Sequence, residues 1–142
     1  MMAEKLRVGV IGAGYLGKFH AEKYAAMDDV VLVGVADVNQ KQAERVAAAV
    51  HSAAYDGHEK LIGKVDAVSI VVPTPYHFSV SKDFLEDKIH VLIEKPMTVT
   101  VEEADELIRI AESNKAIIQV GHLLTGLQPE GSAILCGEIQ FA

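Results

Sequence analysis

The chain has 142 residues, of which 50% are hydrophobic and 23% are charged, a balance that excludes a disordered protein and fits one globular domain. Its formal net charge is −7 and it has no basic stripe with interleaved aromatic residues, so nucleic acid is not an expected partner. Cys136 is the only cysteine, which excludes an internal disulfide and a cysteine-based zinc site. No apolar run approaches the length of a membrane span, so we expect no membrane insertion and a cytoplasmic location.

Segments typical of strands and of helices alternate along the chain. The expected strands are 6–11, 30–36, 53–55, 67–72, 90–94 and 116–120, and the expected helices are 15–26, one that begins after Asn39, one that follows Pro75 and ends near residue 87, and one that begins after Thr100. The strands are nearly continuous apolar runs, which is typical of strands buried on both faces of a sheet. Their alternation with helices implies right-handed crossovers. The sequence therefore predicts an α/β fold: a doubly wound parallel sheet between two layers of helices.

Local patterns in two of these helices predict how they begin and which face they bury. Thr100 and Glu103 form a capping box at the start of the last helix. In the first helix the small residues Gly17, Ala21 and Ala25 repeat every four positions. That spacing places them on one helix face, where we expect the helix to lie close to the sheet.

The turn after the first strand reads Gly12-Ala13-Gly14-Tyr15-Leu16-Gly17, the pattern G-x-G-x-x-G. The pattern alone is weak evidence, but here a strand precedes it and a helix follows it, as dinucleotide binding requires. Gly12 permits the tight turn, Gly14 lets the backbone approach a pyrophosphate, and Gly17 lets the helix pack against the strand. The free N–H groups at the helix start, where Tyr15 and Leu16 lie, then face the phosphates with the help of the helix dipole. We therefore expect residues 12–17 to bind a dinucleotide.

Asp37 ends the second strand, about 20 residues after Gly17. Its carboxylate can accept hydrogen bonds from the adenosine ribose and would repel a 2′-phosphate, which favours NAD over NADP. Lys41 and Arg45 lie just downstream and could weaken the preference for NAD over NADP. Two alternatives stay open: flavin adenine dinucleotide uses the same fingerprint, and a glycine turn followed by a surface aspartate would bind no ligand.

A third informative segment, Glu94-Lys95-Pro96, ends the fifth expected strand. Together with the glycine turn and with Pro73-Thr74-Pro75-Tyr76-His77, it resembles the Gfo/Idh/MocA family, which is named for glucose–fructose oxidoreductase and inositol dehydrogenase. The resemblance covers roughly residues 5–122. It implies an N-terminal NAD(P)-binding Rossmann domain, and hydride transfer between NAD and the CH–OH group of a sugar, cyclitol or related polyol.

The resemblance also implies roles for individual residues. It places Lys95, with Glu94 beside it, near the nicotinamide and substrate, where the lysine positions or polarises the reacting hydroxyl or carbonyl. In the family the peptide bond before the proline at the position of Pro96 is often cis. The segment from Val72 to His77 resembles the family's loop beside the cofactor; Val72, Pro73 and Thr74 are expected to contact the cofactor, and His77 is expected to reach the nicotinamide side. Both segments follow strands, and ligands bind outside the carboxyl ends of parallel strands. A solvated surface lysine and a locally hydrogen-bonded histidine are the alternatives.

The chain departs from the family's pattern after Gly121-His122, where Leu123-Leu124-Thr125 replaces the usual arginine, phenylalanine and asparagine. We expect the Rossmann domain to span residues 1–121. Residues 122–142 are expected to be a linker remnant and the start of a C-terminal substrate domain, because Gly137-Glu138-Ile139 resembles that start. In the family the second domain supplies the substrate pocket and the aspartate and histidine partners of the lysine. Its apparent absence argues against turnover by this chain alone.

Three functional hypotheses therefore stay open. The chain is an oxidoreductase or its nucleotide-binding half, a non-catalytic NAD(H)-binding module, or a truncated part of a longer enzyme. The residues that would choose a substrate are not in the chain, and the histidines show no spacing typical of a metal site. Apolar side chains near the C-terminus favour a homodimer formed by strand addition: Ile134, Leu135, Ile139 and Phe141.

Overall fold

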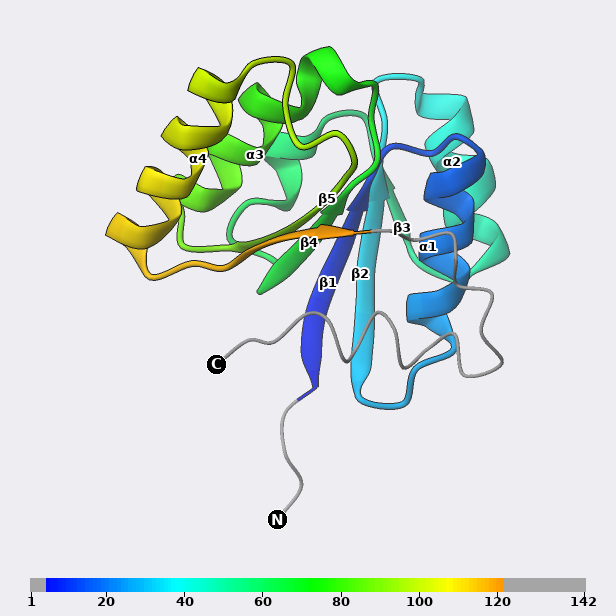
Figure 1. Ribbon diagram of the computed structural model, residues 1–142. Helices are drawn as coiled ribbons and strands as arrows, with labels where there is room; N and C mark the ends of the chain where they lie inside the picture. The colour runs from blue at the N-terminus through cyan, green and yellow to red at the C-terminus, as the bar shows by residue number, and fades with distance from the viewer. Residues whose placement is uncertain (1–4, 122–142) are drawn as a thin grey trace.

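The computed structural model describes residues 5–121, and Figure 1 shows them as a parallel sheet between two layers of helices. The strands are β1 (Leu6–Ile11), β2 (Val30–Ala36), β3 (Ala53–Tyr55), β4 (Ala67–Ile70), β5 (His90–Glu94) and β6 (Ile118–Gly121). The helices are α1 (Tyr15–Ala25), α2 (Gln40–Ala49), α3 (His77–Glu86) and α4 (Val101–Asn114), with short 3₁₀ helices η1 (His58–Leu61) and η2 (Thr74–Tyr76). The predicted α/β fold is confirmed. The expectations for residues 122–142 lie outside the described residues.

The six strands lie in the order β3-β2-β1-β4-β5-β6, and every pair is parallel. The chain first adds strands outward from β1 to β3, then crosses back to place β4 on the other side of β1. The strand order therefore reverses between β1 and β4. In open α/β sheets this reversal leaves a crevice at the carboxyl ends of the strands, where ligands bind.

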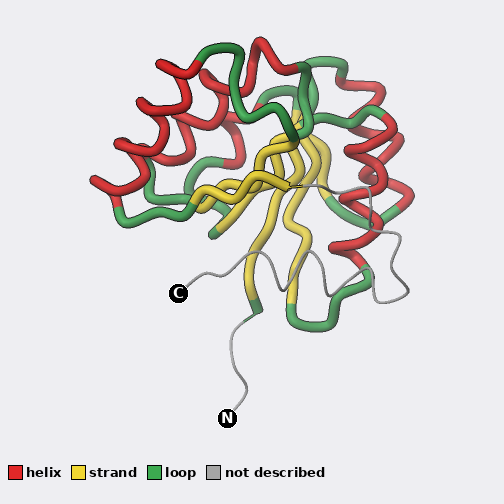
Figure 2. The backbone as a smooth tube through the Cα atoms, viewed as in Figure 1, coloured by secondary structure: helices red, strands yellow, loops and turns green. Residues whose placement is uncertain are grey.

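The core has two parts, one on each face of the sheet. Figure 2 shows helices on both sides of the strands. On one face, side chains of the sheet pack against α1 and α2; the buried members include Val10, Val35, Ala21, Tyr24 and Val46. On the other face they pack against α3 and α4; the buried members include Ile70, Ile93, Phe84, Leu85 and Leu107. Burial on both faces explains why the strands are almost continuously apolar.

Two strands are shorter at one end than the sequence predicts. β4 ends at Ile70 rather than at Val72, because the chain turns towards Pro73, which has no N–H to continue the ladder. β6 begins at Ile118 rather than at residue 116, because the N–H of Ala116 bonds back to the last turn of α4. β6 also ends one residue later than expected, at Gly121, and the bounds of β1, β2, β3 and β5 agree with the sequence prediction.

Side-chain caps begin α2 and α4, and the cap predicted for α4 is confirmed. Asn39 accepts a hydrogen bond from the N–H of Gln42 at 3.2 Å, and the Thr100 hydroxyl accepts one from the N–H of Glu103 at 3.1 Å. The return bond at α4 differs from a standard capping box, since the Glu103 carboxylate accepts from the N–H of Val99 rather than from that of Thr100.

The buried face of α1 differs from the prediction at one position. Gly17 and Ala21 are buried against the sheet, but Ala25 is exposed and Tyr24 is buried instead. An α-helix turns 100° per residue, so a strict four-residue repeat drifts off the face, and a step of three restores it. Across residues 5–121 no helix is long and apolar enough to cross a membrane.

Candidate functional site

The turn between β1 and α1 requires glycine at its first position. Gly12 has φ +112°, in the left-handed half of backbone space that side chains disfavour, and a Cβ there would lie 2.2 Å from the carbonyl oxygen of Val71. Its N–H donates to the carbonyl of Ala36 at 2.8 Å. The turn therefore packs between the carboxyl ends of β2 and β4.

The other two glycines of the motif have opposite surroundings. A Cβ on Gly17 would lie 1.8 Å from the carbonyl oxygen of Gly12, so α1 begins in direct contact with the turn. A Cβ on Gly14 would meet no atom within 4 Å, and Gly14 is exposed at the N-cap of α1 without a side-chain cap. The first N–H groups of an α-helix have no intrahelical acceptor. Open space in front of free amides fits the diphosphate of a dinucleotide.

Asp37 follows β2 and is fixed by two backbone amides. Its Oδ2 accepts a hydrogen bond from the N–H of Ala13 at 2.7 Å, and its Oδ1 accepts one from the N–H of Asn39 at 2.8 Å. The first bond joins the acid to the glycine turn, and the second joins it to the start of α2. Each carboxylate oxygen can accept a further hydrogen bond, which fits a ribose hydroxyl beside the turn.

A cleft of about 620 Å³ opens at the carboxyl ends of β1, β2 and β4. Its lining is mostly apolar, with a few polar groups, as expected of a small-molecule site. It includes five of the residues expected to hold a cofactor: Gly12, Gly14, Asp37, Val72 and Pro73. The others are absent from its lining: Tyr15, Leu16, Gly17, Thr74, Glu94 and Lys95. Gly17 is buried beneath the turn, and the side chain of Tyr15 is 86% exposed.

His77 is buried between the loops that follow β4 and β5. The side chain is 1% exposed, its Nε2 lies 2.9 Å from the carbonyl oxygen of Val72, and its Nδ1 lies 3.0 and 3.2 Å from those of Pro96 and Met97. A neutral imidazole carries one N–H and carbonyl oxygens only accept, so the tautomer decides whether His77 donates to the loop after β4 or to the loop after β5. In this arrangement neither ring nitrogen is free for nicotinamide or substrate. The geometry indicates that His77 positions the two loops.

The segment after β5 has the shape that the resemblance implies. The Lys95–Pro96 peptide bond is cis, as expected, and the Lys95 side chain is exposed. Glu94 is mostly buried and its Oε2 lies 3.6 Å from Nε2 of His20 on α1, whose ring is buried and makes no hydrogen bond among the described residues. The Lys95 side chain is thus exposed to solvent at the end of β5, one strand beyond the cleft.

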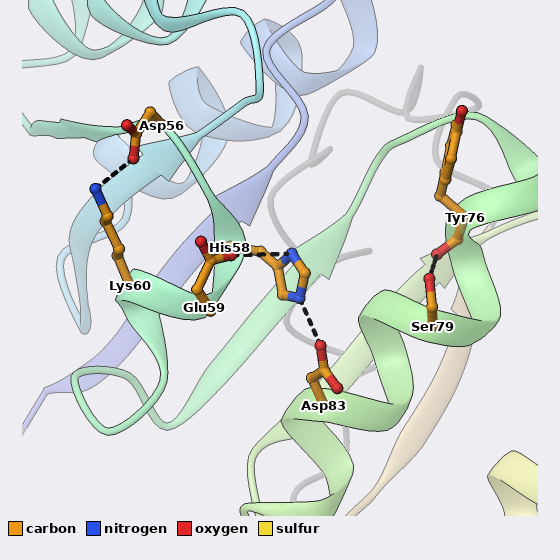
Figure 3. Close-up of polar contacts among 7 residues, drawn as sticks. All are labelled: Asp56, His58, Glu59, Lys60, Tyr76, Ser79 and Asp83. Atoms are coloured by element: carbon orange, nitrogen blue, oxygen red, sulfur yellow. Dashed lines mark hydrogen bonds and ion pairs between the residues drawn. The ribbon is translucent and has the colours of Figure 1, made fainter.

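Nine residues of the cleft lining are not among those expected to hold the cofactor. They are Ile11, Ala36, Val38, Gln42, His58, Val71, Tyr76, Ser79 and Val80. They come from separate segments, which reach the same edge only when the sheet is assembled. Figure 3 shows His58 next to Asp83 and Glu59, with Tyr76 and Ser79 at the start of α3. No spacing in the sequence relates these segments, so only the topology could have found them.

A family model described as the oxidoreductase family with an NAD-binding Rossmann fold matches residues 6–122. The chain belongs to the Gfo/Idh/MocA family. This confirms the family suggested by the glycine turn and by Glu94-Lys95-Pro96, and it identifies the domain as NAD-binding.

Two curated Gfo/Idh/MocA relatives and one solved structure illustrate the match. UDP-N-acetylglucosamine 3-dehydrogenase from Acidithiobacillus ferrooxidans is 46% identical over 118 residues, which are 83% of this chain and 37% of that protein. Myo-inositol 2-dehydrogenase from Thermotoga maritima is 30% identical over 119 residues, which are 82% of this chain and 36% of that protein. A structure of the Acidithiobacillus enzyme superposes with a TM-score of 0.81 at 41% identity, covering 95% of this chain and 44% of that one. The chain therefore spans less than half the length of these relatives.

Proposed function

We propose that the chain is the nucleotide-binding domain of an NAD-dependent oxidoreductase that acts on the CH–OH group of a sugar, cyclitol or related polyol. Its relatives are named as dehydrogenases of a nucleotide sugar and of an inositol. The observation that carries the proposal is the Asp37 carboxylate, which is hydrogen-bonded to the glycine turn at 2.7 Å. It brings the two groups that a dinucleotide needs, phosphate-binding amides and a ribose acceptor, into one cleft.

Each half of the dinucleotide site then has its own binding group. The amides that follow Gly14 bind the diphosphate, and Asp37 accepts from the adenosine ribose. The fixed negative charge of Asp37 repels a 2′-phosphate, which favours NAD over NADP. Lys41 and Arg45 are both exposed on α2, so solvent screens their charges and they weaken this preference only in part.

The reaction proposed is reversible oxidation of a secondary alcohol. NAD⁺ supplies the acceptor for the hydride that leaves the carbinol carbon, while the hydroxyl proton is released. The Lys95 ammonium lies beside the reacting oxygen and stabilises the alkoxide charge that develops on it. Glu94, buried at the end of β5 next to His20, holds the strand end that presents Lys95. His77 ties the loop that follows Lys95 to the loop after β4.

A second candidate function is a non-catalytic NAD(H)-binding module. The observation that favours it is that Lys95 is exposed to water and does not line the cleft that opens at β1, β2 and β4. Turnover separates the two candidates. Oxidation of any member of a panel of nucleotide sugars, inositols and glycosides, followed by NADH absorbance, would support the dehydrogenase. NADH binding without turnover of any of them would support the module.

The test of the proposed function is a titration of NADH and NADPH against the wild type and Asp37→Ala by calorimetry. We expect the wild type to bind NADH more tightly than NADPH. Asp37→Ala should reduce the difference between the two affinities, because it removes the carboxylate that repels the 2′-phosphate of NADPH. Equal affinity of the wild type for both cofactors would remove the role of Asp37. No binding of either at millimolar concentration would overturn the whole proposal.

The proposal extends to two further properties. NAD(H) is an intracellular cofactor, so the proposed function favours a cytoplasmic location, which fractionation of the source cells would test. The expected homodimer depends on residues outside the described part of the chain, and light scattering at high concentration would test it.

A further inference from the structure

The first helix buries a histidine whose ring nitrogens are unpaired. His20 lies less than two turns into α1, and its side chain is 1% exposed. Neither ring nitrogen makes a hydrogen bond among the described residues. A buried polar group without a partner destabilises the fold, and a leucine at this position would avoid that cost. Packing alone therefore does not explain an imidazole at position 20.

The Glu94 carboxylate lies near this ring, at the strand end that precedes Lys95. Its Oε2 is 3.6 Å from Nε2 of His20, slightly beyond hydrogen-bond distance. The ring of Tyr24, on the same helix, has its centroid 6.4 Å from that of His20, but the Tyr24 hydroxyl is already 2.6 Å from Oγ of Ser69 on β4. A carboxylate only accepts and an imidazole N–H donates. Glu94 is therefore the suitable partner for His20.

This pair lies on one side of the glycine turn, and Asp37 lies on the other. The neighbouring strands run in the order β2-β1-β4-β5, so the end of β2 with Asp37 and the end of β5 with Glu94 flank the turn that follows β1. In the proposed complex the adenosine ribose contacts Asp37 and the diphosphate contacts residues 12–17. The nicotinamide half then extends towards β5. His20 thus lies on the helix that binds the diphosphate, and Glu94 lies on the strand beside the nicotinamide half.

We propose that His20 is a positioning residue: in the dinucleotide complex its imidazole donates a hydrogen bond to Glu94 and so fixes the end of β5, with Lys95, against α1. The proposal rests on the proposed function and adds a residue to that same site. A movement of a few tenths of an ångström brings Nε2 and Oε2 within hydrogen-bond distance. Because the His20 ring is buried, it acts through Glu94 and not by touching the cofactor.

The experiment compares a ligand that has the nicotinamide half with one that lacks it. NADH and ADP-ribose are titrated by calorimetry against the wild type, His20→Leu, His20→Phe, His20→Gln, Glu94→Ala and the double variant of His20→Leu with Glu94→Ala. Two apolar variants are made so that one remains if the other does not fold. Glu22→Gln is the matched control, because Glu22 is exposed on the same helix. Thermal melting without ligand measures the stability of each variant.

We expect His20→Leu and His20→Phe to weaken NADH about tenfold, as loss of a hydrogen bond to a charged group does, and to leave ADP-ribose unchanged. His20→Leu should melt at or above the wild-type temperature, because it removes two unpaired buried nitrogens. A side chain with only a packing role would lower the melting temperature and the affinity together. Weaker NADH binding in a protein of undiminished stability is therefore the result that indicates positioning.

The remaining variants test whether His20 acts through Glu94. His20→Gln keeps an N–H donor, so it should bind NADH within about threefold of the wild type. The double variant should bind NADH as Glu94→Ala does, because the hydrogen bond is already lost when either partner is removed. Glu22→Gln should match the wild type.

Three outcomes would overturn this proposal while leaving NAD binding intact. The first is that a folded apolar variant of His20 binds NADH as tightly as the wild type. The second is that it weakens ADP-ribose as much as NADH, which would mean a general distortion of the glycine turn. The third is that His20→Leu weakens NADH by the same factor with and without Glu94, which would mean that the two residues act independently. Failure of the wild type itself to bind NADH would overturn the proposed function, and this proposal with it.

Discussion

Asp37 accepts a hydrogen bond from the backbone N–H of Ala13, with Oδ2 and N 2.7 Å apart. The bond joins the carboxyl end of β2 to the middle of the glycine turn. The acid that a dinucleotide would contact is therefore also a part of the turn that holds the phosphates. Because one residue serves both purposes, a substitution of Asp37 affects folding as well as cofactor choice, and the two effects need separate measurements.

Removal of the Asp37 carboxylate should destabilise the free protein. Asp37→Ala breaks the bonds to Ala13 and Asn39, and hydrogen bonds to a charged group contribute about 1.5–3 kcal/mol each when buried. Asp37 is half-buried, so we expect a total loss of about 1–3 kcal/mol in the free energy of unfolding, measured by urea denaturation without cofactor. Asp37→Asn keeps an acceptor and should lose less than half as much. Equal stability of Asp37→Ala and wild type would contradict this structural role.

The glycines of the turn allow binding and folding to be separated. A Cβ at position 14 meets nothing, whereas one at position 17 would overlap the carbonyl of Gly12 at 1.8 Å. Gly14→Ala should therefore melt within a few degrees of the wild type but bind NADH at least tenfold more weakly, because its methyl group occupies the space of the diphosphate. Gly17→Ala should lose several kcal/mol of stability, about 3 or more.

Each glycine variant is the control for the other. Thermal melting reports on folding and calorimetry with NADH reports on binding. If Gly14→Ala binds NADH like the wild type, the diphosphate does not approach this turn. If Gly17→Ala melts like the wild type, the close contact between α1 and the turn is not a constraint.

The sheet could be predicted because its signals are local. Each strand is an apolar run that ends at a glycine, proline or acidic residue, so the bounds of β1, β2, β3 and β5 follow from the sequence. The error at the end of β4 is also local, because it depends on Pro73. Whether Ala25 or Tyr24 is buried depends instead on how the helical repeat drifts against the sheet, which is a tertiary contact.

The cofactor turn was predictable for the same reason, since the glycines, the strand and the acid lie within one short segment. The environment of His77 was not. Its three carbonyl partners belong to the loops after β4 and β5, which are adjacent only in the assembled sheet. The sequence therefore left two roles open for His77, one beside the nicotinamide and one as a locally hydrogen-bonded residue, and these contacts favour the second.

Loss of the buried His77 imidazole should cost stability because the ring packs between two loops and hydrogen-bonds to their backbone carbonyls. His77→Leu leaves the carbonyl that accepts from the ring without its donor, which costs about 1–3 kcal/mol, and it also replaces the ring with a side chain of another shape. We expect urea denaturation to show a loss of about 2–4 kcal/mol in the free energy of unfolding. Ser79→Ala, exposed on the same helix, should lose less than 0.5 kcal/mol, roughly the range of surface substitutions. A His77→Leu variant as stable as the control would contradict the positioning role.

Stability should also depend on pH through His90. The Nδ1 of His90 accepts a hydrogen bond from the N–H of Ile117 at 3.0 Å, so this nitrogen must be unprotonated in the folded chain. Burial lowers the pKa of His90 below its ordinary value, and the nearby Asp66 carboxylate opposes part of that effect. The unfolded chain, with an ordinary pKa of about 6.5, then binds a proton before the folded chain does. The free energy of unfolding should therefore fall as the pH decreases below about 6.5, and the loss should level off once the folded histidine is also protonated.

Urea denaturation between pH 7.5 and 5 measures this dependence, and His90→Asn is the matched variant. Asparagine offers an oxygen near the position of Nδ1, so it can still accept from Ile117, but it does not titrate. Asp56 and Asp66 have lowered pKa values, so their contribution to the free energy of unfolding is lost only at a more acidic pH than the range from 7.5 to 5. We expect a flatter pH dependence in His90→Asn, and a midpoint for His90 below 6.5 in the NMR titration of the wild type. If the free energy of unfolding changes with pH equally in the wild type and in His90→Asn, or if the midpoint of His90 lies above 6.5, the bond to Ile117 does not control protonation of His90.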